Sequence, residues 1–208
     1  MVFPQHLAAL YSPRRADMLA IVVFALLSLA FGQTPTPCQS PMEWTGQRMV
    51  IDSSKSFYER ARVYYDATNK RVRHVEEIEQ GRERDFYDVL YLFNEKKEYR
   101  VNLHTKKCNV TTLTREFRPV GVPADAKFFG VAEIGAPNIP LEHLTTVTFG
   151  GNYTTDKVRY LTTVTSPDCV PIADNYYNDV TGYVETRYFE IRPGTVDPAH
   201  FQPDSSCM

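Results

Sequence analysis

The chain has 208 residues, of which 43% are hydrophobic and 23% are charged, and its formal net charge at pH 7 is −2. This length is typical of one domain, and this composition excludes both a disordered chain and a polytopic membrane protein. The nearly balanced charge excludes the basic excess of a general nucleic-acid binder, so we expect no nucleic-acid partner.

The first 32 residues have the pattern of a secretory signal. Two arginines lie shortly before an apolar run over residues 19–31, and small residues occur at its end. The run is too short for a spanning helix, which needs about 20 residues. We predict a signal peptide at residues 1–32, with residues 1–17 as an upstream extension if Met18 is the start. A buried N-terminal helix is the alternative interpretation.

The later sequence predicts a secreted glycoprotein without a membrane span. No second apolar stretch approaches the spanning length, so we expect an extracellular or luminal protein once the signal is removed. The triplets Asn109-Val-Thr111 and Asn152-Tyr-Thr154 are glycosylation sequons. They predict glycans on Asn109 and Asn152, and therefore an exposed position for each asparagine.

Alternation of apolar and polar residues predicts two β-hairpins. Residues 59–66 and 70–76 alternate on either side of a polar turn, and residues 86–93 and 99–103 form a second pair of the same kind. Residues 86–93 are apolar on both faces. This pattern favours a central strand that is covered on both sides.

The segment over residues 112–140 interrupts the alternation. Proline and glycine recur throughout it, so it predicts a long connection with at most a helical turn or two. Strand patterns resume at residues 144–149, 157–165 and 182–191. Many strands with almost no amphipathic helix predict an all-β fold, either a sandwich or a partly open barrel.

No catalytic motif is present in the sequence. The histidines are scattered singly, and HExxH, Cys-x-x-Cys and Gly-x-Ser-x-Gly patterns are absent. His74 alternates with Val72 on a predicted strand, which favours a buried structural histidine. Glu76, Glu77 and Glu79 are interpreted as a solvated face. We therefore predict that the protein is not an enzyme and has no organic cofactor.

Calcium is the one metal for which the sequence offers donors. Asp174, Asn175, Asn178 and Asp179 supply hard oxygen atoms in what we interpret as a loop, at a spacing unlike that of an EF-hand. An ordinary polar turn is the favoured interpretation. No calcium ligand is assigned from the sequence.

Four cysteine-centred segments resemble those of the ependymin family. They contain Pro37-Cys38-Gln-Ser-Pro41 ahead of Trp44, Thr105-Lys-Lys-Cys108, Pro167-Asp-Cys169-Val-Pro171, and a tail with Thr186-Arg-Tyr-Phe-Glu-Ile191, Gly194, Asp197-Pro198, Phe201, Pro203 and Cys207. The resemblance runs from about residue 37 to the C-terminus. It identifies residues 33–208 as a single ependymin-like β domain.

The resemblance implies two stacked antiparallel sheets, a partly open barrel-like sandwich, that enclose an apolar pocket. It implies a secreted or lysosomal glycoprotein, usually a homodimer and associated with calcium, that binds hydrophobic ligands such as fatty acids or glycolipids. Four cysteines allow three disulfide pairings, and the residues alone do not choose among them. The resemblance implies the bridges Cys38–Cys169 and Cys108–Cys207.

Candidate pocket residues follow from the two-residue period of the strands. They are Val63, Tyr65, Val89, Tyr91, Tyr99, Val101 and Tyr160. An error of one residue in register would move each set to the opposite face of the sheet, and a dry closed core is the alternative. We expect the segment 112–140 to act as a flap over the mouth. The rival function is that of a matrix or cell-adhesion glycoprotein acting through its surface.

Overall fold

The structure is a computed structural model that describes residues 34–153, 157–179 and 182–208. The predicted signal peptide lies outside the described residues. Residues Thr36–Met208 cluster as one unit, to which the following description applies. No helix in the described part of the chain has the length and apolar character needed to cross a membrane.

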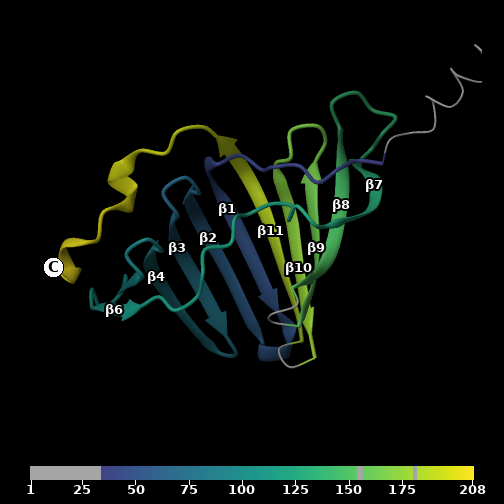
Figure 1. Ribbon diagram of the computed structural model, residues 1–208. Helices are drawn as coiled ribbons and strands as arrows, with labels where there is room; N and C mark the ends of the chain where they lie inside the picture. Colours follow the sequence, from purple (N-terminus) through teal and green to yellow (C-terminus); the bar gives the residue numbers. More distant parts are fainter. Residues whose placement is uncertain (1–33, 154–156, 180–181) are drawn as a thin grey trace, which may run out of the picture. The chain divides into compact units, whose positions relative to one another are not determined.

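Within these residues the structure forms eleven strands and three short 3-10 helices (Figure 1). The strands are β1 (Glu43–Asp52), β2 (Phe57–Asp66), β3 (Arg71–Gln80), β4 (Glu83–Leu92), β5 (Lys97–Asn102), β6 (Cys108–Thr112), β7 (Lys127–Gly135), β8 (His143–Tyr153), β9 (Val158–Thr165), β10 (Pro171–Asn178) and β11 (Gly182–Pro193). The 3-10 helices are η1 (Ser53–Lys55), η2 (Pro198–Phe201) and η3 (Ser205–Cys207).

The strands form one continuous antiparallel sheet in the order β6-β5-β4-β3-β2-β1-β11-β10-β9-β8-β7. The prediction of an all-β fold is confirmed. The finer expectation of two stacked sheets is corrected, because β1 pairs with β2 on one side and with β11 on the other. Figure 1 shows that this single sheet curves, which gives it a concave and a convex face.

The hairpin of β2 and β3 shows how local sequence sets the fold. The carboxylate of Asp66, fully buried, accepts hydrogen bonds from the backbone N–H of Asn69 at 2.9 Å and from Nε of Arg71 at 2.7 Å. Lys70 then adopts the left-handed φ of 52° that reverses the chain. The predicted turn is therefore present, and it starts β3 in register with β2.

The second half of β4, residues 89–92, is buried on both faces. Val89 and Tyr91 pack on the concave face with Leu113, whereas Leu90 and Leu92 belong to a separate cluster on the convex face. Alternate residues of a strand point to opposite sides of a sheet, so one strand contributes to two cores.

The interpretation of residues 112–140 as a connection is wrong for part of its length. Lys127–Gly135 is a strand, β7, at the edge of the sheet. A bulge between Phe128 and Gly130 shifts its register against β8. The extra residue of a bulge breaks the two-residue alternation, which explains why the pattern hides the strand.

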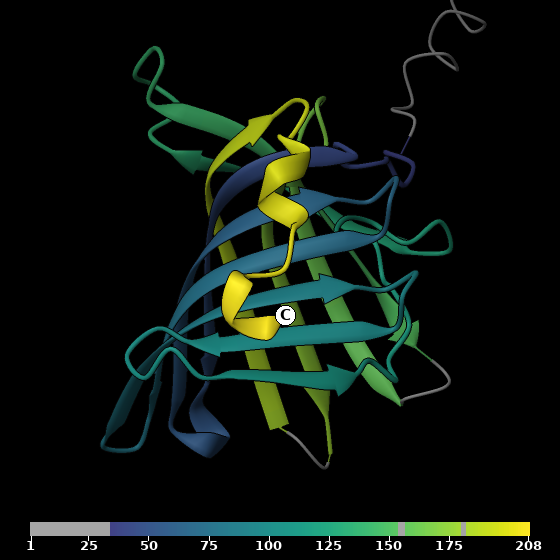
Figure 2. The ribbon, with the colours of Figure 1, turned by 90° about the vertical axis from the view of Figure 1, so that its left-hand side faces the viewer.

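Two segments outside the strands cover opposite faces of the sheet. The crossover segment, residues 113–126, runs from β6 to β7 across the concave face (Figure 1). The C-terminal segment, residues 194–208, lies over the convex side of β2–β5 (Figure 2).

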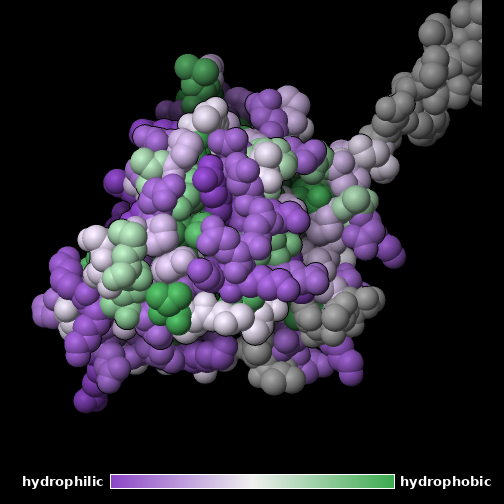
Figure 3. Space-filling model, turned by 60° about the vertical axis from the view of Figure 1, so that its left-hand side comes forward, coloured by the Kyte–Doolittle hydropathy of each residue, from purple (hydrophilic) through white to green (hydrophobic). Residues whose placement is uncertain are grey.

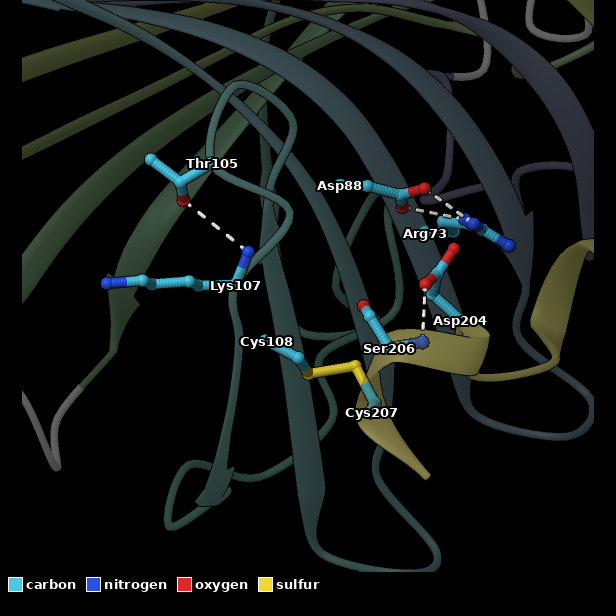
Figure 4. The surroundings of a disulfide bond; sticks show 8 residues. All are labelled: Arg73, Asp88, Thr105, Lys107, Cys108, Asp204, Ser206 and Cys207. Atoms are coloured by element: carbon cyan, nitrogen blue, oxygen red, sulfur yellow. Dashed lines mark hydrogen bonds and ion pairs between the residues drawn. A yellow bond between two sulfur atoms is a disulfide. The ribbon is translucent and has the colours of Figure 1, made fainter.

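Both disulfides have the pairing that the resemblance implies. Cys38 is bonded to Cys169, and Cys108 is bonded to Cys207. Figure 4 shows the second bridge, which attaches η3 to β6 next to the ion pair of Arg73 and Asp88. The C-terminal segment is thus covalently held against the sheet.

Candidate functional site

The concave face contains a cavity of about 540 Å³ between the sheet and the crossover segment. Residues of five strands and of the crossover segment line it, namely Trp44, Arg48, Val63, Tyr65, Val72, His74, Tyr91, Phe93, Arg115, Glu116, Phe117, Arg118, Val120 and Tyr188. This volume lies within the range of about 300–1,000 Å³ that is typical of small-molecule sites.

Six of the fourteen residues that line the cavity are Trp, Tyr or Phe. The ring of Tyr65 is stacked between Trp44, at a centroid distance of 5.0 Å, and Phe117, at 6.1 Å. The ring of Phe93 meets Phe117 edge-on at 5.1 Å, and Tyr188 meets Trp44 edge-on at 6.0 Å. Such contacts fix the rings of the wall relative to one another and leave an apolar surface facing the cavity.

The crossover segment is attached to the sheet at two points on either side of the cavity. At one, Leu113 is buried against β4 and its N–H donates to the carbonyl of Lys96 at 2.9 Å. At the other, the N–H of Val120 donates to Oη of Tyr65 at 2.9 Å. Between them, the side chains of residues 115–118 reach the cavity.

A network of buried charges lies on the concave face beside the cavity. Arg48 Nε donates to Glu59 at 3.0 Å, and Arg100 Nη1 donates to Glu76 at 3.1 Å. Each guanidinium thus neutralises one buried carboxylate. Burial, together with the neighbouring charge of Glu59, raises the pKa of Glu76 to about 7 despite the opposing effect of Arg100.

His74 connects this network to the cavity in a defined tautomer. Burial and the positive charges of Arg48, Arg115 and Arg100 hold the pKa of His74 well below its usual range, so the ring is neutral. Its Nδ1 lies 3.3 Å from Nη2 of Arg48, which can only donate. The hydrogen-bond network therefore assigns Nδ1 as the acceptor and places the ring proton on Nε2.

Trp44 contributes a second donor. Its side chain is 1% exposed, and among the described residues its Nε1 is the one buried side-chain nitrogen or oxygen with no hydrogen-bond partner. A buried donor without an acceptor is costly and uncommon in native proteins.

The network contains one set of side chains with the geometry of a metal site. Ligand atoms of Glu59, His74 and Glu76 lie within 4.8 Å of one another. Arg48 and Arg100 already balance the two carboxylates, so a divalent cation here would add uncompensated buried charge. The arrangement therefore fits an internal ion-pair network better than a metal site.

The calcium donors considered from the sequence do not converge. Residues 171–178 form strand β10 rather than a loop. Asp174 is buried and accepts hydrogen bonds from Thr162 and Tyr188, whereas Asn175 accepts one from the exposed Tyr183. Adjacent residues of a strand point to opposite faces, so these two side chains do not meet at one cation.

The structure brings together some of the candidate pocket residues. Val63, Tyr65 and Tyr91 line the cavity. Val89 lies on the same face but is packed beneath the wall, with 0% of its surface exposed.

The other three candidates lie elsewhere. Tyr99 packs with Leu90 on the convex face, and Val101, two residues later, shares that face. Tyr160 lies on β9, which is on the other side of β1 from β2–β5 in the sheet order. It lines a separate hollow of about 800 Å³. These placements correct the set expected from periodicity: residues 89–92 of β4 are buried on both faces, and Val101 of β5 is buried on the convex face, so burial alone does not identify the cavity side.

Sequence reasoning missed several cavity residues. Trp44 and Arg48 come from β1, a strand that the pattern analysis did not include. Residues 44–50 show no regular alternation, so the one available signal was the presence of a single tryptophan. Glu76 was interpreted as part of a solvated face, which is wrong, because it is buried on the concave side.

Comparison with known proteins identifies the family. The model of the family described as Ependymin matches residues 81–207, which is more than half of the chain. The chain belongs to the ependymin family. The matched region contains β4–β11, the crossover segment and the C-terminal segment of this ependymin-family protein.

Individual relatives cover most of the chain. It is 28% identical to mouse mammalian ependymin-related protein 1 over 178 residues, which span 84% of this chain and 78% of the mouse protein. It is 24% identical to goldfish (Carassius auratus) ependymin-2 over 191 residues, spanning 91% and 88%. An uncharacterized conserved protein of Thermus thermophilus aligns with 80% of this chain and 88% of its own, at 12% identity and a TM-score of 0.47.

Proposed function

We propose that this ependymin-family protein binds and carries hydrophobic small molecules, such as fatty acids or glycolipids, in the concave-face cavity. The observation that carries the proposal is the stack of Trp44, Tyr65 and Phe117, which lines a cavity of ligand size beneath a covering segment. The chain acts here by binding, and no reaction is assigned to it.

Figure 3 shows one side of the molecule, on which hydrophilic side chains dominate and hydrophobic ones form small separate groups. Binding of an apolar molecule on this side would be weak, since large apolar contact areas are needed for affinity. An enclosed aromatic cavity provides that area.

The proposal includes a secreted protein, in the extracellular space or the lysosomal lumen, with glycans on Asn109 and Asn152. Both asparagines are exposed on strands, β6 and β8. A homodimer and an association with calcium remain predictions from the resemblance, and matrix adhesion remains the rival function.

The test is to identify what the protein carries. The full chain is secreted from eukaryotic cells, purified without detergent, and extracted for mass spectrometry. We expect lipid at near-stoichiometric amounts, and after delipidation we expect saturable uptake of a fluorescent fatty acid. Absence of both, together with specific binding to cells or collagen, would favour the adhesion function instead.

A further inference from the structure

We propose that the glycan predicted on Asn152 folds back into the hollow on β8–β11 and packs there against aromatic side chains. The hollow is thus a carbohydrate-binding site whose ligand is the protein's own N-linked sugar chain. This inference rests on one part of the proposed function, the glycosylation of Asn152. It does not depend on what the concave-face cavity binds.

A row of side chains crosses the sheet in this hollow. Asn152 on β8 is opposite Arg159 on β9, Arg159 is opposite Tyr177 on β10, and Tyr177 is opposite Tyr183 on β11. Directly opposed residues of antiparallel strands point to the same side of a sheet, and all four residues line the hollow. Tyr183 is separated by an odd number of residues from Tyr188, which lines the concave cavity, so the row lies on the convex face.

Apolar surface remains exposed in the hollow. Phe129 is 64% exposed, Tyr183 is 49% exposed and Leu161 is 38% exposed. The C-terminal segment packs over β2–β5 on the convex side, so it does not cover these side chains (Figure 2). A contiguous exposed apolar surface usually marks a place where another group binds.

The lining suits a sugar better than a purely apolar molecule. The guanidinium carbon of Arg159 lies 4.6 Å from the ring centroid of Tyr177, and Oη of Tyr183 donates to Oδ1 of Asn175 at 2.9 Å. Aromatic ring faces carry negative charge density, which attracts the weakly positive C–H groups on the face of a sugar ring. The guanidinium, amide and phenol groups between the rings can exchange hydrogen bonds with sugar hydroxyls.

The position of the sequon determines which sugar reaches the hollow. Asn152 is exposed and lines the hollow, so a glycan on its side-chain nitrogen begins inside the site. Neighbouring strands are about 4.8 Å apart, which places Tyr177, two strands away, about 10 Å along the row. A ligand tethered at this distance has a high effective concentration, so weak stacking contacts are enough to hold it. Any other partner of this face would have to displace a bulky covalent group.

Asn109 provides a matched control within the same chain. It is the other sequon asparagine, it is exposed on the edge strand β6, and it is not part of the hollow. The experiment uses full-length protein secreted from eukaryotic cells that make high-mannose glycans. An endoglycosidase that cleaves between the first two sugars is added, and glycopeptide mass spectrometry follows the release at each site.

We expect release at Asn152 to be about tenfold slower than at Asn109 in the folded protein, because the enzyme acts on the small fraction of glycan that has left the hollow. The two rates should become equal after denaturation. The sugar protons of the Asn152 glycan should also show upfield ring-current shifts in NMR spectra, since they lie over aromatic faces.

Variants of the lining assign the protection to the hollow. Tyr177→Ala should bring the release rate at Asn152 close to that at Asn109, and Phe129→Ala, which changes a more exposed ring, should raise it in part. The control Tyr58→Ala removes a tyrosine of β2 that lies outside the hollow, and it should change neither rate. Thermal unfolding verifies that each variant is folded.

The outcomes separate this inference from the carrier function. Equal release at the two sites of the folded wild type, an unmodified Asn152, or unchanged release in both Tyr177→Ala and Phe129→Ala would overturn the carbohydrate site while the carrier function stands. Slow release at Asn152 from a protein that neither contains nor takes up lipid would instead remove the carrier function and leave the carbohydrate site standing.

Discussion

The two faces of strands β2–β5 differ in what covers them. On the convex face, the C-terminal segment inserts Val196 and Phe201 against Leu90 and Leu92, and the four side chains form a buried cluster. On the concave face, the crossover segment places Phe117 over Tyr65 but also carries the charged Arg115, and a cavity remains. The same strands thus support a filled core on one side and a site on the other.

The C-terminal segment and the crossover segment also differ in how they are attached to the sheet. The C-terminal segment is held by the disulfide of Cys207 and by a hydrogen bond from Arg73 to the carbonyl of His200 at 2.9 Å. Over the cavity, the N–H of Val120 donates to Oη of Tyr65, and the ring of Phe117 packs on that of Tyr65. The convex cover is thus apolar and covalently fixed, whereas the concave cover carries charged side chains and leaves a cavity.

The largest effect is expected from removing the disulfide that fixes the C-terminal segment on the convex face. The bridge between Cys108 and Cys207 joins residues 99 apart in the sequence. Its removal by replacing both cysteines with serine should lower the free energy of unfolding by about 4–5 kcal/mol in the loop-entropy model. Denaturant unfolding measures this change. Ligand affinity of the folded variant should stay within about twofold, since the bridge lies on the face opposite the cavity.

A loss of affinity that exceeds the loss of stability would show that the two faces are coupled through the sheet. In that case the convex cover would be part of the site, and the contrast between a core and a cavity would not hold.

The next effect is a pH dependence that belongs to the concave face. Burial raises the pKa of Glu76 to about 7 from an ordinary value of 4.5. The folded protein therefore binds this proton more tightly than the unfolded chain does. The resulting stability is fully present below about pH 4.5 and is lost as pH rises through about 7, a change on the order of 3 kcal/mol.

The pKa of His74 is lowered, so its contribution has the opposite sign: it is present above pH 6.5 and is lost as pH falls below that value. The measurement must therefore be the difference in unfolding free energy between wild type and Glu76→Gln across pH 4.5 to 8. We expect this difference to fall with rising pH. The control Glu98→Gln removes a more exposed carboxylate from the same Arg100, and an equal fall in both variants would show that the pH dependence does not come from Glu76.

The contrast between the faces also explains what the sequence could predict. The hairpins were readable because Asp66 and the residues after it have the chemistry of a turn, and because β2 alternates cleanly. The side on which Tyr99 and Val101 lie was not readable. It depends on a C-terminal segment about a hundred residues away, which covers the face that carries Tyr99; the local alternation of Tyr99 and Val101 with polar residues does not reveal that cover.

The same limit applies to the site. Nothing in the local sequence distinguishes Glu76, which is buried beside Arg100, from its exposed neighbour Glu79. The pairing of Glu76 requires β3, β4 and β5 to be in register, which is a tertiary property. Likewise, the missing partner of Trp44 is visible only when all of its neighbours are in place.

A matched pair on one strand tests which face holds the ligand. Val72 and Val75 both lie on β3, but Val72 lines the cavity and Val75 points to the convex side. Val72→Phe should fill part of the cavity and reduce fatty-acid affinity by at least about tenfold. It should lower the free energy of unfolding by at most about 1–3 kcal/mol. Val75→Phe adds the same ring to a partly exposed position and should leave affinity unchanged.

Fluorescent fatty-acid titration of both variants, with thermal unfolding as the check on folding, gives the comparison. Equal affinities in the two variants would place the binding site away from the concave face of β3. A loss in Val75→Phe alone would assign it to the convex side.

The smallest effect concerns the hydrogen bond that joins the crossover segment to Tyr65. Tyr65→Phe keeps the stacked ring but removes the Oη atom that accepts from the N–H of Val120 at 2.9 Å. Since Val120 is only half-buried, water can replace the acceptor, and the loss should be about 0.5–1.5 kcal/mol. This energy should appear locally, as about tenfold faster hydrogen exchange at the Val120 amide and faster ligand release.

Tyr64→Phe, whose ring stacks on His200 on the convex face, is the control, and it should alter neither rate. Faster release in Tyr65→Phe with unchanged exchange at Val120 would mean that the ligand leaves by another route. If both rates rise together, the segment that closes the cavity is also the one that opens it.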